Sequence, residues 1–352
     1  MQANAATIVI ARESRGLRQT ELARLMSERL GEPVSQGYVS KAEAGRLAIT
    51  DERLQALSDV LRYPITMLCR APRDLSVGVG LVHHRKRASL GALVLRRIQA
   101  QLAVTRTQVD NLLDLDVRPE LKLHRYTLTA EDTPSEIAER VRTAWKLGHE
   151  PIPDLVSVIE GAGSVVLCRS FDTTDLDAVS QWPEGEVPLI LLDPQAPADR
   201  FRLSLAHELG HLLLHHQPGP THQHEKQADE FASAFLLPTA RIRPELRRTP
   251  IDLQRLMELK AIWGVSMAAL ARRAVDLGAV SEWRYRDLMV EMSMLGYRKQ
   301  EPAAITYEYP SALTNMIADH IEHRGTTIEE LATIAGLFPD EFTELYLTKP
   351  SF

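Results

Sequence analysis

Hydrophobic residues recur at helical spacing along most of the chain, and only two short runs have the composition of strands. In residues 21–30, for example, Leu22, Leu25 and Met26 fall on one face of a predicted helix. The strand-like runs are 164–169 and 187–192. Similar periods predict further helices at 89–113, 134–147, 155–161, 253–262, 267–277, 284–294, 311–323 and 328–337. The pattern therefore predicts a multidomain, mainly α chain with one small sheet.

The first 70 residues read as a compact set of short helices separated by glycine and proline. Thr20, Ser35 and Thr50 are predicted to cap three of these helices, and Gly45 ends the one that Ser35 begins. Residues 71–80 have the composition of a linker. We therefore predict an all-α domain over 1–70, a linker and long helix over 71–132, a central α+β domain over 133–249, and a helical C-terminal region over 250–352.

The length and composition are those of a globular protein with more than one core. A chain of 352 residues, 44% hydrophobic and 25% charged, normally forms two or three domains. The longest apolar runs, such as 187–192, are far shorter than the roughly 20 residues that cross a bilayer. The N-terminus lacks the features of a secretory signal, and two cysteines are too few for a disulfide framework. We expect a cytoplasmic protein with no membrane partner.

Charge is unevenly distributed along the chain. The net charge of −6 alone argues against nucleic-acid binding. Residues 75–109, however, contain no Asp or Glu, and their basic residues are Arg85, Lys86, Arg87, Arg96, Arg97 and Arg106. A local cationic surface is compatible with the acidic total.

The strongest chemical signal is His207-Glu208-x-x-His211. Two histidines four residues apart on a helix lie one turn above each other and can bind one metal ion. The intervening Glu208 points toward the same site, where its carboxylate can take a proton from water and act as the catalytic base. Flanking leucines predict that this helix is buried, and a buried carboxylate is costly unless it is paired or lies near a cation.

A catalytic zinc site needs a third protein ligand and an open position. The spacing of one zinc-protease class would require a histidine at 217, but Gln217 stands there. We instead predict Glu225 as the third ligand and Asp229, one turn further on, as the acceptor that orients a ligating histidine. The rivals for the third ligand are His215, His216, His222 and His224.

This ligand set implies hydrolysis of an amide by water at zinc, with Glu208 as base and then acid. The pattern contains no candidate for a covalent nucleophile. The predicted strand 187–192 precedes the active-site helix, and two interpretations of it stay open. It is either an edge strand that holds an extended peptide or an ordinary core strand.

These residues resemble the ImmA/IrrE family of metallopeptidases. The resemblance rests on Leu205-Ala-His-Glu-Leu-Gly-His-Leu-Leu-Leu-His215, on Glu225-x-x-Ala-Asp229-x-Phe-Ala-x-x-x-Leu-Leu-Pro238, and on Arg200 and Arg202 ahead of them. It implies a zincin-like, gluzincin-like endopeptidase domain that binds zinc, or else manganese. His207, His211 and Glu225 would be the ligands and Glu208 the base. It also implies a protein substrate, a helix-turn-helix repressor or the chain itself, whose cleavage controls stress or mobile-element genes.

The N-terminal domain resembles the phage-repressor (Cro/C1, XRE) helix-turn-helix. The resemblance rests on Gln19-Thr-Glu-Leu-Ala-Arg and on Ser35-Gln-Gly-Tyr-Val-Ser-Lys-Ala-Glu-Ala-Gly45, with a longer segment at 27–34 than the family usually has. It implies binding to a double-stranded DNA operator as a homodimer. The predicted DNA contacts are a phosphate contact by Gln19 and base-edge contacts by Ser35, Gln36, Tyr38 and Lys41.

Three functions are compatible with this sequence. The first is a DNA-binding transcription regulator with zinc endopeptidase activity. The second is a non-proteolytic XRE regulator whose peptidase-like domain senses a metal or a ligand, and the third is an antitoxin. The intact set of His207, Glu208, His211 and Glu225 favours the first, because a sensor has no need of Glu208.

Overall fold

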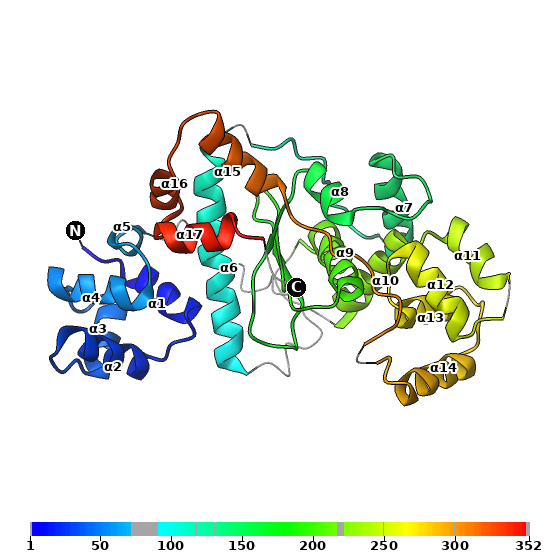
Figure 1. Ribbon diagram of the computed structural model, residues 1–352, viewed down its shortest axis with the longest axis horizontal. Helices are drawn as coiled ribbons and strands as arrows, with labels where there is room; N and C mark the ends of the chain where they lie inside the picture. Colours follow the sequence, from blue (N-terminus) through cyan, green and yellow to red (C-terminus); the bar gives the residue numbers. More distant parts are fainter. Residues whose placement is uncertain are drawn as a thin grey trace. The chain divides into compact units, whose positions relative to one another are not determined.

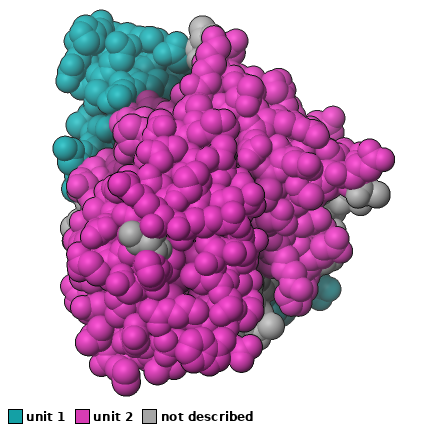
Figure 2. Space-filling view, turned by 90° about the vertical axis from the view of Figure 1, so that its right-hand side faces the viewer, with its two compact units in different colours: residues 1–80, 86–118, 313–349 teal, residues 81–85, 119–312, 350–352 magenta. Residues whose placement is uncertain are grey.

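The chain forms two compact units, which Figure 2 shows in different colours. A computed structural model describes residues 2–71, 91–116, 118–129, 131–216, 222–248, 250–298 and 300–349. Unit 1 comprises 1–80, 86–118 and 313–349, and unit 2 comprises 81–85, 119–312 and 350–352. Of the predicted linker 71–80 only Ala71 is described, and Arg85, Lys86, Arg87 and Gln217 lie outside the described residues. The domain boundaries at 70, 132 and 249 stay a prediction.

Unit 1 contains helices and no strand in its described residues (Figure 1). The helical character of the N-terminal domain is thereby confirmed. The helices are α1 (Ala5–Ser14), α2 (Gln19–Leu30), α3 (Gln36–Glu43), α4 (Asp51–Leu61), α5 (Ile65–Leu68), α6 (Ala92–Leu113), α15 (Ala312–Glu322, whose first residue is assigned to unit 2), α16 (Ile328–Ala335) and α17 (Pro339–Tyr346).

Side chains at the helix starts explain where the N-terminal helices begin. Ser35 Oγ accepts a hydrogen bond from the backbone N–H of Tyr38 at 3.1 Å, so the cap predicted for α3 is confirmed. The cap predicted at Thr20 is wrong, because α2 begins earlier, at Gln19, with Arg18 at the N-cap position. The carboxylate of Glu21 accepts from the backbone N–H of Arg18 at 2.7 Å and so satisfies one free donor of that helix start.

The C-terminal helices pack within unit 1 against α6 and the N-terminal helices. The phenol of Tyr346 on α17 donates to the Gln108 side chain on α6 at 2.7 Å. Asp340 and Glu341, in the first turn of α17, form ion pairs with Arg62 and Arg15. Segments more than 200 residues apart in sequence therefore form one folding unit.

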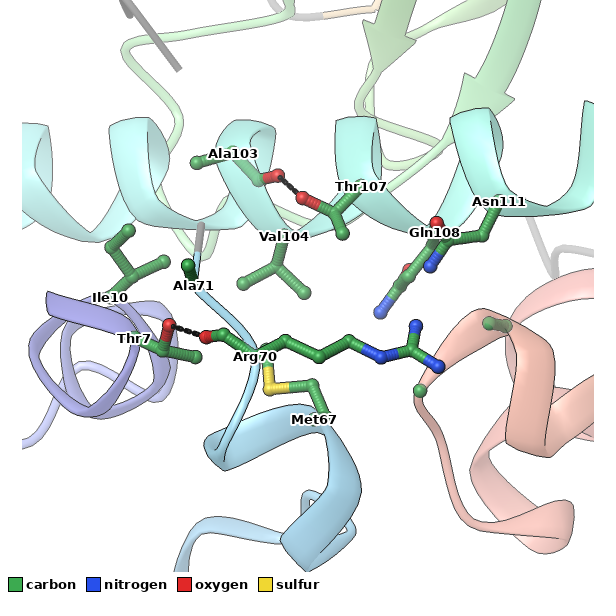
Figure 3. Close-up of a pocket in the computed structure, with 12 residues that line it drawn as sticks. Thr7, Ile10, Met67, Arg70, Ala71, Ala103, Val104, Thr107, Gln108 and Asn111 are labelled. Carbon is green, nitrogen blue, oxygen red and sulfur yellow. Dashed lines mark hydrogen bonds between the residues drawn. The ribbon is translucent and has the colours of Figure 1, made fainter. Parts of the chain in front are cut away.

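A small, mainly apolar pocket lies where α1, α5, α6 and the end of α16 meet (Figure 3). At its edge Thr7 Oγ1 on α1 donates to the backbone carbonyl of Arg70 at 2.6 Å. Asn4, the N-cap of α1, donates its backbone N–H to the carbonyl of Leu68 at 2.9 Å. These bonds hold the end of the N-terminal domain against its first helix.

Unit 2 combines helices with a three-stranded mixed sheet of order β1-β3-β2, in which β1 is parallel and β2 antiparallel to β3. The predicted fold class, mainly helical with a small sheet and a helical C-terminal region, is confirmed. The elements are α7 (Pro134–Ala144), α8 (Leu155–Gly161), β1 (Val165–Cys168), β2 (Ala178–Gln181), β3 (Leu189–Leu192), α9 (Ala198–Leu214), α10 (His222–Leu236), α11 (Thr239–Arg247), α12 (Leu253–Trp263), α13 (Met267–Asp276) and α14 (Glu282–Met294).

The sheet corrects one interpretation of the sequence. The strand predicted at 187–192 is β3, and it is the central strand rather than an edge. The edge-strand hypothesis for 187–192 is therefore wrong, because hydrogen bonds to β1 and β2 occupy both of its sides. The sequence pattern missed β2, which packs against helix α9 and pairs with β3 alone among the described strands.

Helices α9 and α10 lie side by side in unit 2, and Gly210 allows their close approach (Figure 1). A Cβ atom at position 210 would lie 3.1 Å from Phe231 Cδ1 and 3.3 Å from Ala228 Cα. Both contacts are tighter than ordinary van der Waals packing, so a side chain at 210 would push the helices apart. Gly210 immediately precedes His211, so the lack of a side chain at 210 also determines how closely His211 approaches α10.

No helix within the described ranges has both the length and the apolar composition required to cross a membrane. The two cysteines, Cys69 and Cys168, are not joined by a disulfide.

Candidate metal centre and DNA-binding face

Buried ion pairs fix the start of α9 and so the direction in which its histidines project. Asp199, in the first turn, lies 2.5 Å from the ammonium of Lys260 on α12, which also contacts Glu301 at 2.9 Å. One turn later, Arg202 pairs with Glu308. All five side chains are largely buried, so removing Lys260, Arg202 or Glu308 would leave a buried charge unpaired.

The structure brings together the three residues that the sequence predicts as metal ligands. The Nε2 atoms of His207 and His211 on α9 lie 3.0 Å apart. Glu225 in the first turn of α10 places one carboxylate oxygen 3.6 Å from His207 Nε2 and the other 3.4 Å from His211 Nε2. Bonds of about 2.0–2.2 Å at tetrahedral angles place zinc ligands roughly 3.3–3.5 Å from one another. The two oxygen–nitrogen distances fit one shared ion, and the two Nε2 atoms lie slightly closer together than such an ion would hold them.

The state of Glu225 supports the same conclusion. Its side chain is only 6% exposed, and among the described residues neither carboxylate oxygen has a hydrogen-bond donor at bonding geometry. Burial alone would raise the pKa of Glu225, but the neighbouring rings of His207 and His211 outweigh burial and hold it well below its usual value. A buried, ionised carboxylate is costly unless a cation lies beside it, and a divalent ion between the three side chains would supply that charge. The residues thus fit a divalent metal.

Hydrogen bonds from the far side of each ring orient the two histidines. His207 Nδ1 lies 3.0 Å from Asp229 Oδ1, as predicted for a carboxylate one turn after Glu225. Burial would lower the pKa of His207, but the neighbouring carboxylates of Asp229 and Glu225 outweigh burial and raise that pKa to about 10. The bond to Asp229 leaves His207 Nε2 directed toward the ligand group.

His211 has a different outer partner. Its Nδ1 lies 2.9 Å from Nδ1 of His215, whose Nε2 lies 3.1 Å from the side-chain oxygen of Gln227 on α10. His215 follows the last residue of α9, where the backbone leaves helical geometry (φ −120°, ψ 93°). Its ring is therefore near His211 without joining the ligand group, which argues against His215 as the third ligand.

The other rival histidines lie apart from the ligand group. His216 bonds to the backbone carbonyl of Tyr126 at 3.0 Å, and the ring of His224 stacks on His215 with centroids 4.3 Å apart. His222 is exposed at the start of α10. The group of potential ligand atoms within 4.8 Å of one another, as found among the described residues, is that of His207, His211 and Glu225.

Glu208 is fully enclosed beside the ligands. One of its carboxylate oxygens accepts a hydrogen bond from Ser180 Oγ on β2 at 2.6 Å. Burial raises the pKa of Glu208 to about 7, against the opposing effects of His207 and Ser180. A carboxyl group with a pKa near neutrality can both take and return a proton at physiological pH. Sequence reasoning missed Ser180, and since β2 was also missed, no signal placed it near Glu208.

The predicted DNA-contacting residues surround α3 in unit 1. Ser35, Gln36 and Lys41 are exposed, as expected for a helix that enters the major groove. Gln36 donates to the side-chain oxygen of Gln19 at 2.6 Å, so the first residues of α2 and α3 are coupled. Tyr38 differs from the expectation, because its half-buried ring lies under the guanidinium of Arg53 at 4.4 Å.

A buried ion pair supports the Gln19–Gln36 contact from behind. Gln19 donates to Glu43 at 2.7 Å, and Glu43 accepts two hydrogen bonds from the Arg12 guanidinium at 2.5 and 3.1 Å. This network joins α1, α2 and α3, so both glutamines are held before any DNA arrives. Such preorganisation lowers the entropy cost of binding.

Comparison with protein families gives a match for two segments of the chain. Residues 8–68 match the helix-turn-helix family HTH_3. Residues 159–275 match the family Peptidase_M78, described as the IrrE N-terminal-like domain. They form an IrrE N-terminal-like domain. This domain includes the sheet, α9 and α10, and hence every residue of the candidate metal centre. No curated protein matches this sequence closely enough to serve as a relative.

Proposed function

We propose that this chain is a DNA-binding regulator and a zinc-dependent endopeptidase that cleaves a repressor-type protein or itself. One observation carries the peptidase part: buried Glu208 lies beside two imidazoles and a carboxylate that face one another at metal-ligand spacing. The match to Peptidase_M78 supports the same reaction class. The two free cysteines and the absence of a spanning helix in the described residues are compatible with action in the cytoplasm.

The residues of the centre have distinct tasks in this proposal. His207, His211 and Glu225 hold the metal, zinc or alternatively manganese. When bound, the metal supplies Lewis acidity toward a carbonyl and lowers the pKa of water. Glu208 takes the proton of the attacking water and returns it to the leaving amine. Ser180 holds the Glu208 carboxylate in place, and Asp229 and His215 orient the two imidazoles.

Removing the metal tests the peptidase proposal. The zinc-loaded full-length chain is incubated alone, so that one molecule can cleave another, and separately with a proteome-derived peptide library. Mass spectrometry then locates new termini in each mixture. We expect cleavage that a chelator abolishes and that added Zn²⁺ or Mn²⁺ restores. A chain that binds one zinc ion per molecule and yet produces no metal-dependent cleavage in either mixture would contradict the peptidase.

We further propose that the helix-turn-helix domain binds an operator as a homodimer, with α3 in the major groove. The domain match at 8–68 and the exposed Gln36 and Lys41 support this. Dimers of such domains read two half-sites about one helical turn apart.

The double variant Gln36→Ala plus Lys41→Ala is expected to lose sequence-specific binding. Lost base contacts cost about 1–3 kcal/mol each, so discrimination between operator and random duplex should fall by at least tenfold. Fluorescence anisotropy with a duplex selected from a random library measures the change. Unaltered discrimination in the double variant would mean that α3 is not the reading helix.

A further inference from the structure

A groove in unit 1 runs between the helix-turn-helix domain and the first turns of α6. One wall is formed by the α1–α2 turn, the start of α2 and Gln36, and the other wall by Leu93 and Arg96 of α6. Both glutamines of the Gln19–Gln36 contact line this groove. Residues of α6, which lies outside the matched domain at 8–68, therefore stand directly beside the predicted DNA-contacting residues.

The close approach of α6 to the α1–α2 turn fixes this arrangement. Gly16 in the turn has φ +69°, and a Cβ atom there would lie 3.2 Å from Cδ of Arg97. The stem of Arg97 thus packs against the turn, because Gly16 carries no side chain. Ile98, one residue further along α6, is fully buried. The neighbouring Arg96 is consequently held on the exposed side of α6, at the groove.

Two cations in this groove have no carboxylate partner among the described residues. Arg96 and Arg18 are exposed, and neither forms an ion pair with another described residue. Arg12, the third arginine of the lining, pairs with Glu43, and the single acidic lining residue, Glu13, lies 3.5 Å from Arg12. The free charge of the groove is therefore positive in a protein whose net charge is −6.

We propose that Arg96 and Arg18 bind phosphates of the operator strand that passes the start of α2, so that the DNA-binding surface extends onto α6. The inference rests on DNA binding by the helix-turn-helix domain. Gln19 and Gln36 face the groove and a duplex docked on α3 would bring its backbone there. Contacts of this kind fix the register and strengthen binding without reading sequence.

Each arginine that neutralises one phosphate changes the salt dependence of binding. The slope of log affinity against log salt concentration is about −0.9 per phosphate contact. Both protomers of the proposed homodimer carry the change, so Arg96→Gln in the full-length chain should reduce the slope by about two and lower the affinity about ten- to hundredfold near 0.1 M salt. The preference among operator sequences should not change, because the contact is to the backbone.

The experiment measures the affinity for the selected duplex between 50 and 200 mM KCl. Arg248→Gln is the matched control, since Arg248 is an exposed arginine of unit 2 and its loss changes the net charge equally. Arg18→Gln should behave like Arg96→Gln, and both variants should keep the thermal midpoint of the wild type. These results together would support the extended surface.

Three outcomes would overturn it. If the wild type selects a duplex but Arg96→Gln keeps its full salt slope, the surface ends within the helix-turn-helix domain while DNA binding stands. A variant with an unchanged DNA slope that instead loses binding to an acidic peptide would assign the groove to a protein partner. A wild type that selects no duplex at all would remove the DNA-binding proposal, and this inference with it.

Discussion

Glu208→Gln is expected to slow peptide hydrolysis by roughly 10²–10⁴-fold while the chain keeps its metal and its fold. Glutamine preserves the size and the hydrogen bond from Ser180 at 2.6 Å, but it cannot take a proton from water. The ligand atoms of His207, His211 and Glu225 are not altered by this change. Zinc content by elemental analysis and cleavage rates on the same substrate measure the two quantities separately.

A matched control makes this result specific. Glu230→Gln makes the same chemical change on the neighbouring helix α10. Glu230 is exposed and accepts a hydrogen bond from Ser135, so this variant should leave hydrolysis unchanged. Comparison of gene regulation by Glu208→Gln and wild type then distinguishes the proposed functions. Equal regulation by both forms would favour a regulator or antitoxin whose peptidase-like domain does not need to cut.

The ligand geometry was predictable because it follows from local spacing. Residues i and i+4 of a helix lie on one face, so His207 and His211 had to be neighbours once their segment was helical. Glu225 and Asp229 follow the same rule on α10, which is joined to α9 by a short connection. The structure confirms the proximity of these side chains, with distances of 3.0–3.6 Å.

What the sequence could not predict depends on long-range pairing. Strand β2 has four residues, Ala178–Gln181, and two of them are polar, so its hydrophobic pattern is too short to detect. It is a strand only because β3 pairs with it, and that pairing brings Ser180 to Glu208. The position of β3 at the centre of the sheet was hidden for the same reason.

The grouping of the C-terminal helices with the N-terminal domain was equally hidden. The amphipathic pattern of 328–337 shows which face is apolar but does not identify the partner of that face. Contacts such as that between Tyr346 and Gln108, and the ion pair of Arg15 with Glu341, join residues more than 200 positions apart. Only the folded chain shows that both the C-terminal and the N-terminal helices pack against α6.

The role of His215 was not foreseen, although its spacing contained a signal. His215 stands four residues after His211, so the rule that joins His207 to His211 also places these two side chains on one face. The sequence interpretation considered His215 only as a rival for the third ligand. In the structure the backbone leaves helical geometry at His215, and its Nδ1 lies 2.9 Å from His211 Nδ1.

Variants of the metal centre are expected to lose different amounts of zinc affinity. The loss should be largest where a ligand is removed and smaller where a residue that orients a ligand is removed. Glu225→Ala removes the anionic ligand itself, so the loss should exceed the roughly 10- to 100-fold typical for residues that merely orient a ligand. His215→Leu removes the acceptor 2.9 Å from His211 Nδ1 and should fall within that 10- to 100-fold range. Competition with a chromophoric zinc chelator, on the purified full-length chain, gives the dissociation constants.

Two further variants show whether this order has the stated cause. His215→Asn keeps a hydrogen-bond acceptor near His211 and should recover most of the affinity that His215→Leu loses. His216→Ala removes the adjacent histidine, which bonds to Tyr126 instead of a ligand, and should bind zinc like the wild type. Zinc bound with undiminished affinity by Glu225→Ala would exclude Glu225 as the third ligand. Since that carboxylate is buried beside both imidazoles, such a result would also leave its burial without a physical reason.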